Sequence, residues 1–263
     1  MSKDKIYKDI TVDDYMTIVV THECNRKCAF CVDIYRGNEE YITLDNVDKA
    51  LKFAVKNNIK DILLVGGEPS LHPDIIEIAR MVKSYGLTLI YTTNFDDLDT
   101  IYELDKYVDH FNFSYYEQDV VRGGTGFDFS KLPNPSKIKN ASTTLSYILH
   151  SGRVKSKEDL DNIIDRYSER FDNLKFTTLT NVNDFTEAVQ IVPFLEEIET
   201  DEDFIAFGEI VVQVYRGYEI KRYDKVINES AKQSWKCHAD GEMSRTWVRT
   251  NATKRKDVNR DIK

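Results

Sequence analysis

Three cysteines fall within eight residues near the start of the chain, and this feature limits the possible folds and functions more than any other. Cys24, Cys28 and Cys31 follow the spacing C-x₃-C-x₂-C. Polar residues fill positions 25–27, which argues against three cysteines packed together in an apolar core. A compact group of thiols indicates a ligand set for a metal or a cluster rather than a disulfide framework.

The rest of the sequence indicates an environment in which thiols stay reduced. Residues 1–15 lack the apolar segment of a signal peptide, and no apolar run approaches the roughly 18 residues that span a bilayer. We therefore expect a cytoplasmic protein with no membrane partner. The net charge of −9 repels phosphates and disfavours a nucleic-acid partner.

The number of cysteines distinguishes between two kinds of metal site. A [4Fe–4S] cluster has four irons and usually takes four cysteines, so three thiolates leave one iron open, as catalysis requires. A structural zinc ion would need a fourth ligand, which Cys237 or His238 could supply. Zinc sites usually pair their cysteines as C-x₂-C, so the spacing favours a cluster.

Strand-like and helix-like segments alternate through the first two thirds of the chain. The pattern predicts strands at residues 15–21, 61–65, 87–93, 110–115, 143–150 and 174–179, and helices at residues 43–58, 73–85, 97–107 and 156–171. Thr43 is placed to cap the first helix and Gly86 to end the second. Six strands alternating with helices predict an α/β fold with a parallel sheet and right-handed crossovers.

Three further segments interrupt or follow this pattern. Residues 117–140 are rich in glycine and proline and predict a loop, within which residues 122–126 could form a phosphate cradle or a lid. Residues 209–215 and 218–223 predict an antiparallel hairpin. The polar, locally basic tail at residues 251–263 predicts either a solvated segment or a clamp for an anion.

The cysteine segment resembles the signature of the radical S-adenosylmethionine (SAM) superfamily, C-x₃-C-x-aromatic-C, with Phe30 at the aromatic position. The resemblance implies a partial (β/α)₆ TIM-like barrel over roughly residues 15–180. It also implies that the three cysteines hold one [4Fe–4S] cluster whose open iron binds SAM. Reduction of the cluster, by an electron donor such as flavodoxin or ferredoxin, would cleave SAM to a 5′-deoxyadenosyl radical that abstracts a hydrogen atom from substrate.

A glycine-rich turn after the second predicted strand supports the resemblance. It reads Gly66-Gly67-Glu68-Pro69. Two glycines let a backbone approach a ligand closely, and the glutamate offers an acceptor for an ammonium group. In the family that the chain resembles, this turn binds the amino group of SAM. The alternative is an ordinary strand-to-helix turn, but its position one strand after the cysteines favours a role in SAM binding.

Further SAM contacts are expected after the later strands. Asn94 belongs to a segment that resembles the family's T-N-G element, although Phe95 replaces the glycine. Ser114 ends the fourth strand, where the family often places a polar residue against the SAM ribose; the alternative is a solvent-facing strand end. The family's glycine motif after strand five has no match at residues 151–153, which leaves Phe30 and the backbone near Thr178 as candidates for contact with adenine.

Cys237 is the one cysteine outside the group. Some enzymes of this family use a lone cysteine as a hydrogen-atom donor, as epimerases do, whereas a buried core position is the commoner fate of a lone cysteine. The substrate could be a small molecule, a nucleotide or a peptide. Other interpretations are a peptide epimerase, an activase for a glycyl-radical enzyme, or a non-catalytic metal-binding interaction protein.

These elements suggest two regions. We expect residues 1–200 to form the barrel with the cluster and SAM sites. Residues 201–263 are expected to form an extension, made of the hairpin and the charged tail, that closes the barrel or contacts substrate.

Overall fold

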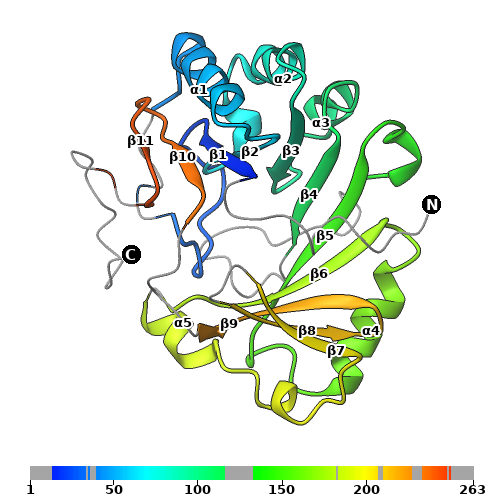
Figure 1. The fold of residues 1–263 in the computed structure, drawn as a ribbon. Coiled ribbons are helices and arrows are strands. Elements are labelled where there is room, and N and C mark those ends of the chain that lie inside the picture. The colour runs from blue at the N-terminus through cyan, green and yellow to red at the C-terminus, as the bar shows by residue number, and fades with distance from the viewer. Residues whose placement is uncertain are drawn as a thin grey trace.

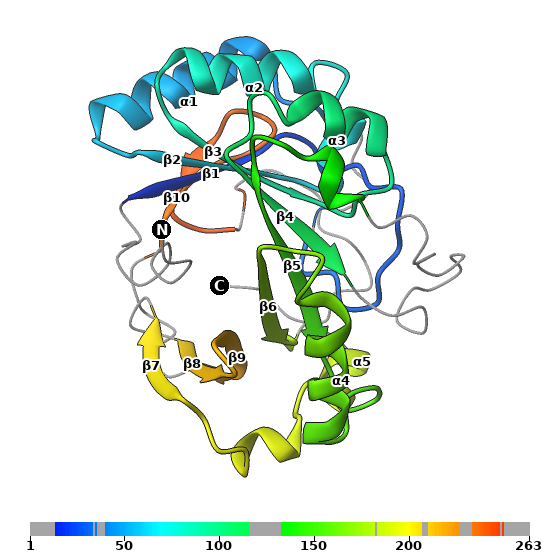
Figure 2. The same ribbon diagram turned by 90° about the vertical axis from the view of Figure 1, so that its right-hand side faces the viewer.

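The computed structural model describes residues 14–33, 35, 40–115, 133–181, 183–206, 210–226, 233–247 and 249. Within these ranges the strands form a single sheet of eleven, in the order β11-β10-β1-β2-β3-β4-β5-β6-β9-β8-β7 (Figure 1). The sheet bends into an open arc, and α1 to α4 lie along its outer side (Figure 2).

The first half of the chain alternates strictly between strands and helices. Its elements are β1 (Tyr15–Val19), α1 (Leu44–Lys56), β2 (Asp61–Val65), the 3₁₀ turn η1 (Pro69–Leu71), α2 (Ile75–Ser84), β3 (Thr88–Thr93), α3 (Leu98–Leu104) and β4 (His110–Tyr115). All four strands predicted here are confirmed. Thr43 caps α1 as predicted, with its side chain accepting from the N–H of Asn46. Gly86 follows α2 with φ +71°, a backbone conformation that favours glycine.

The second half completes the sheet and extends both of its edges. Its elements are η4 (Pro135–Lys137), β5 (Ser142–Leu149), α4 (Lys157–Tyr167), β6 (Asn173–Thr178), α5 (Asp184–Val189), η5 (Pro193–Glu196), β7 (Glu202–Ala206), β8 (Ile210–Tyr215), β9 (Tyr218–Val226), β10 (Trp235–Cys237) and β11 (Met243–Ser244). Strands β1 to β6 are all parallel, so the predicted six-stranded parallel sheet is confirmed.

The two faces of the sheet differ in chemistry because strand residues alternate between them. The outer face packs on the helices with apolar side chains from neighbouring strands, including Met16, Ile18, Leu64, Tyr91, Phe113, Tyr147 and Phe176. The residues between them face the inner side of the arc. On β4, β5 and β6 the inner residues are mainly polar: His110, Asn112, Ser114, Ser142, Thr144, Ser146, Asn173, Lys175 and Thr177.

The C-terminal strands join the same sheet at opposite edges. β8 and β9 form the predicted antiparallel hairpin, and β9 lies parallel to β6. β10 instead pairs in parallel with β1, and β11 pairs antiparallel with β10. Strands from both predicted regions therefore share one sheet. Among the described strands no ladder joins β7 to β11, so this part of the sheet is open.

Two predicted segments fall largely outside the described residues: positions 116–132, which contain the predicted phosphate cradle, and the tail at positions 251–263. No helix among the described residues is both long enough and apolar enough to cross a membrane.

Candidate functional site

The three clustered cysteines lie on the loop that leaves the carboxyl end of β1. In α/β barrels this end of the strands carries the active site. None of the cysteines forms a disulfide, and the three on this loop are partly exposed. Burial raises the pKa of the Cys24 thiol to about 12, and nearby Glu68, Cys28 and Cys31 add to the shift. The three thiols and Glu68 are therefore close neighbours.

Three cysteine thiols on one loop are chemically suited to an iron–sulfur cluster, which proteins hold through cysteine thiolates. Burial disfavours the thiolate form of Cys24 when no metal is bound, and metal binding reverses that preference.

The glycine-rich turn packs directly on the backbone that leads into the cysteine loop. A Cβ atom on Gly66 would lie 2.4 Å from the carbonyl oxygen of Thr21, and one on Gly67 would lie 2.1 Å from that of Glu23. The N–H groups of Gly67 and Glu68 donate to these two carbonyls, each over 2.8 Å. The sequence suggested that the two glycines let the backbone approach a ligand closely. The structure shows that they let the backbone of the turn approach the backbone of the cysteine loop.

Glu68 is a buried carboxylate at the centre of the site, with a side chain that joins the ends of β2 and β3. Its Oε1 accepts from the Thr93 hydroxyl at 2.7 Å and from the N–H of Ser70 at 3.1 Å. Its Oε2 accepts from the N–H of Asn94 at 2.7 Å. Burial raises the pKa of Glu68, and these hydrogen bonds oppose the shift. Since a carboxylate oxygen can accept two hydrogen bonds, Oε2 retains capacity for one more donor.

Asn94 and Asp96 hold the cysteine loop from the side of β3. Asn94 Nδ2 donates to Asn25 Oδ1 at 2.7 Å, and Asn25 Nδ2 donates to Asp96 Oδ2 at 3.1 Å. Arg26 Nε donates to the same Asp96 oxygen at 2.8 Å. Asn94 thus positions the loop, a contact that the motif did not reveal. The sequence analysis also missed Asp96 and Arg26, for which opposite charge was the one available signal.

A second anchor for the loop comes from the start of α5. Asn183 Nδ2 donates to the carbonyl oxygen of Ala29 at 2.8 Å, next to Phe30. The Phe30 ring is partly buried and packs against the edge of the apolar core. The segment between Cys28 and Cys31 is therefore fixed by a residue more than 150 positions away, which no local pattern indicated.

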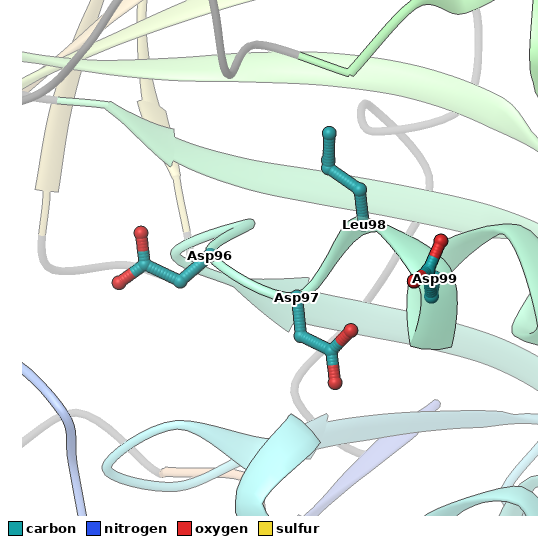
Figure 3. Close-up of a pocket in the computed structure, with 4 residues that line it drawn as sticks. All are labelled: Asp96, Asp97, Leu98 and Asp99. Atoms are coloured by element: carbon teal, nitrogen blue, oxygen red, sulfur yellow. The ribbon is translucent and has the colours of Figure 1, made fainter.

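A pocket of about 300 Å³ lies beside this network at the start of α3, lined by Asp96, Asp97, Leu98 and Asp99 (Figure 3). The carboxylates of Asp96 and Asp97 point in different directions (Figure 3). Asp96 binds Arg26, and Asp97 caps α3 by accepting from the N–H of Thr100 at 3.1 Å. Both carboxylates thus hold the fold together, and we assign no ligand to this pocket.

Phe95 occupies the position where the resembling motif carries glycine, and the backbone keeps the conformation that glycine favours. Its φ is +52°, in the left-handed region. The ring is fully buried and meets Phe113 edge to face, with centroids 6.1 Å apart. The turn at Phe95 therefore has the backbone conformation that glycine favours, and it carries an aromatic side chain where the motif has none.

Ser114 lies on the inner face of β4, directly beside Ser146 of β5. It is partly buried, in a row of polar side chains on the inner face. This placement favours a role facing the interior of the arc over the alternative of a solvent-facing strand end.

Cys237 lies on the other face of the sheet. It is fully buried and stands in register with Ile18, so it faces the helix layer. Trp235, on the same face of β10, meets Phe53 of α1 edge to face with centroids 5.0 Å apart. Burial raises the pKa of Cys237 to about 12. The proposed role as hydrogen-atom donor finds no support in this placement, which favours the core alternative.

Comparison with known proteins finds sequence similarity in the first part of the chain. Residues 18–115 match the family model of the radical SAM superfamily. A GTP 3′,8-cyclase of Helicobacter pylori (strain HPAG1) is 35% identical over 89 residues, which cover 32% of this chain and 28% of that protein. A probable GTP 3′,8-cyclase of Pyrococcus horikoshii is 35% identical over 80 residues, covering 30% and 26%. The chain thus matches under a third of the length of these relatives.

Among solved structures, the likeness extends over almost the whole chain. Streptococcus suis SuiB bound to its precursor peptide SuiA gives a TM-score of 0.62 at 14% identity, covering 93% of this chain and 63% of that one. SuiB bound to S-adenosylmethionine gives 0.58 at 14% identity, covering 95% and 62%. At such low identity the likeness shows the fold alone, and it confirms the expected partial barrel.

Proposed function

We propose that this chain, whose residues 18–115 form a radical SAM domain, is an enzyme that cleaves SAM and abstracts a hydrogen atom from a polar substrate. One observation carries the proposal: three neighbouring thiols and the buried carboxylate of Glu68 meet where β1, β2 and β3 end. Glu68 Oε2 has capacity for one more hydrogen-bond donor, which favours a binding role over the non-catalytic alternative.

Each of the residues near the cluster has a proposed task. Cys24, Cys28 and Cys31 would hold one [4Fe–4S] cluster, which supplies the electron for SAM cleavage when it is bound and reduced. Glu68 Oε2 would accept a hydrogen bond from the SAM amino group. Gly66, Gly67 and Asn94 would position the cysteine loop and the turn, and Ser114 and Phe30 would contact the ribose and adenine.

The substrate class is proposed from the inner face of the sheet. Polar side chains there suit a polar substrate such as a nucleotide, a peptide or a small metabolite. Likeness to the GTP 3′,8-cyclases over about 90 residues supports a nucleotide, and the fold of SuiB, solved with a precursor peptide, supports a peptide. We further propose that residues 201–263 contribute substrate contacts and that a flavodoxin or ferredoxin delivers the electron. Activation of a glycyl-radical enzyme remains an alternative outcome.

The proposal is tested by purifying the protein without oxygen, reconstituting it with iron and sulfide, and measuring 5′-deoxyadenosine release from SAM under reduction. The wild type should bind about four irons and four sulfides per chain. Cys28→Ala should lose both the cluster and the release. Cys237→Ala removes a cysteine from the core on the helix side and should retain both.

A second variant separates SAM binding from cluster binding. Glu68→Gln should release far less 5′-deoxyadenosine per bound cluster, because one carboxylate oxygen becomes an amide nitrogen that cannot accept hydrogen bonds and the SAM ammonium loses a charged acceptor. Full iron content without SAM cleavage in the wild type, with and without added peptides and nucleotides, would support the metal-binding alternative instead.

A further inference from the structure

Two lysines lie side by side on the inner face of the sheet, where β6 meets β9. In the parallel ladder Lys175 stands beside Glu219, and Thr177 stands beside Lys221. The residues between them, Phe176 and Ile220, belong to the apolar core on the outer face. Because strand residues alternate, both lysines must face the inner side of the arc.

The lysine side chains are close enough to interact with each other, and burial is substantial. Lys175 and Lys221 stand on adjacent strands two positions apart in register, and each contributes to the pKa of the other. Lys221 is only 7% exposed. Glu219 is the carboxylate that acts on both lysines, and His110 of β4 lies near Lys175. Two lysines and the carboxylate of Glu219 thus lie together in a partly desolvated setting.

Protonating both lysines at once is unfavourable unless an anion binds between them. Burying a charge destabilises a protein unless the charge is paired, and two like charges side by side add repulsion. The pKa of both lysines is lowered in the folded protein. For Lys175 the main cause is Lys221, followed by burial, and for Lys221 the main cause is burial. An oxyanion between the two ammonium groups would relieve both effects.

The surrounding residues supply what an oxyanion would need. Ser146 of β5 stands in register with Lys175, and Thr177 follows two positions later on the same face of β6. Hydroxyl groups of this kind donate hydrogen bonds to oxyanions alongside ammonium groups. The carboxyl end of β6, at Thr178, lies three residues beyond Lys175. This places Lys175 about 10 Å, and Lys221, which stands beside Thr177, about 3 Å along the strands from the carboxyl edge of the sheet.

We propose that Lys175 and Lys221 form an anion-binding subsite on the inner face of the sheet, which holds a carboxylate or phosphate group of the substrate. That the anion belongs to the substrate rests on the function proposed above; that the lysines bind an oxyanion does not. The subsite would anchor the substrate at a distance from the cluster and leave its reacting carbon near the ends of β1 to β3.

The test is a titration of the apoprotein with inorganic phosphate and, separately, with acetate, at constant ionic strength in chloride. Protein labelled with ¹³C in lysine reports binding through the lysine Cε signals. Lys175→Met and Lys221→Met should each weaken binding by about tenfold, the loss expected for one charged hydrogen bond. Lys52→Met, which changes an exposed lysine of α1 paired with Asp48, should leave binding unchanged.

A variant that is expected to bind the anion more tightly distinguishes a loss of binding from a folding defect. Glu219→Gln removes a carboxylate that competes for both lysines, so at about pH 6, where the lysines are protonated, it should tighten binding by about threefold, which a damaged fold would not do. In the wild type, tighter binding of phosphate than of acetate would indicate a phosphorylated substrate. Tighter binding of acetate than of phosphate would indicate a substrate with a carboxylate. Unsaturable titrations of the wild type, or equal affinities in all variants, would overturn the subsite, whatever the SAM-cleavage assay shows.

Discussion

Arg26 and Asp96 form an ion pair that joins the cysteine loop to the turn after β3, with Arg26 Nε donating to Asp96 Oδ2 at 2.8 Å. The arginine side chain is 10% exposed, so the pair is largely shielded from solvent. Neither residue is specified by the motifs, since Arg26 fills an open position between Cys24 and Cys28 and Asp96 lies outside both motifs. The pair therefore extends the machinery that positions the loop beyond the recognisable signature.

Breaking this ion pair should loosen the loop without removing a ligand. Arg26→Met should shorten cluster retention in the presence of a chelator, since a shielded charge-assisted hydrogen bond contributes about 1–3 kcal/mol to the closed loop. The control is Arg216→Met, which removes an arginine bound to Asp161 and Asp165 at the far hairpin. Equal retention in Arg26→Met and the wild type would mean that the loop holds its shape without the pair.

Gly67→Ala should disrupt the same loop from the other side. The new Cβ would meet the Glu23 carbonyl oxygen at 2.1 Å, and backbone on both sides must move. We expect destabilisation of about 1–3 kcal/mol, as for overpacked sites, together with loss of bound iron. Gly86→Ala is the matched control because its Cβ would meet no atom within 4 Å. It should cost about 1 kcal/mol through its positive φ and leave iron content intact. Normal iron content in Gly67→Ala would refute this account.

At Phe95 the usual order of stability between a glycine and an alanine variant should be reversed. Glycine in an ordinary position is less stable than alanine by roughly 0.5–1 kcal/mol. At a φ of +52° alanine remains strained and glycine does not, so Phe95→Gly should unfold at higher denaturant concentration than Phe95→Ala. Both should be less stable than the wild type because each deletes a buried ring. In Phe113→Gly and Phe113→Ala, on regular strand β4, the normal order should return.

Much of the fold could be predicted because it depends on local patterns. Alternating apolar strands and capped helices gave the six parallel strands, and a short hinge gave the β8–β9 hairpin. The partners of the last strands could not be predicted, since periodicity says which face a strand buries and not which edge it joins. That β9 joins β6 while β10 joins β1 depends on contacts between residues far apart in the chain.

The residues of the candidate site also fall into those that a local motif predicts and those that depend on tertiary packing. The cysteines and Glu68 were predicted because a local motif names them. Asn183, which fixes the cysteine loop from α5, could not be, and neither could the neighbouring lysines of β6 and β9, since each depends on tertiary packing. Cys237 shows the converse, because a conspicuous residue turned out to face the helix layer.

Variants of Cys237 should therefore behave as core variants. Cys237→Ser should lower the free energy of unfolding by about 1–3 kcal/mol, since it buries a hydroxyl among apolar groups, and Cys237→Ala should cost less. Both should release 5′-deoxyadenosine at the wild-type rate per cluster. Once a substrate is known, product formation should also persist. Loss of product with undiminished 5′-deoxyadenosine release would restore the hydrogen-donor hypothesis.

Lys175 should make the stability of the apoprotein depend on pH in a defined direction. In the fold its pKa falls from 10.5 to about 7, first because of Lys221 and then because of burial. Between these values the unfolded chain holds a proton that the folded chain lacks, so the free energy of unfolding rises with pH across this window. Lys175→Met removes the titrating group and should flatten that rise.

The comparison with the wild type turns this into a sharp measurement. By urea denaturation, Lys175→Met should be more stable than the wild type by about 1–3 kcal/mol at pH 7, where most of the penalty for protonating the buried lysine is present. The difference should shrink at about pH 9.5, because the wild-type lysine is then neutral when folded. Lys52→Met, at an exposed lysine whose pKa is raised by its hydrogen bond to Asp48, should show no such convergence. A gain in Lys175→Met that stays constant with pH would mean that Lys175 keeps its proton in the fold and that its pKa is not lowered.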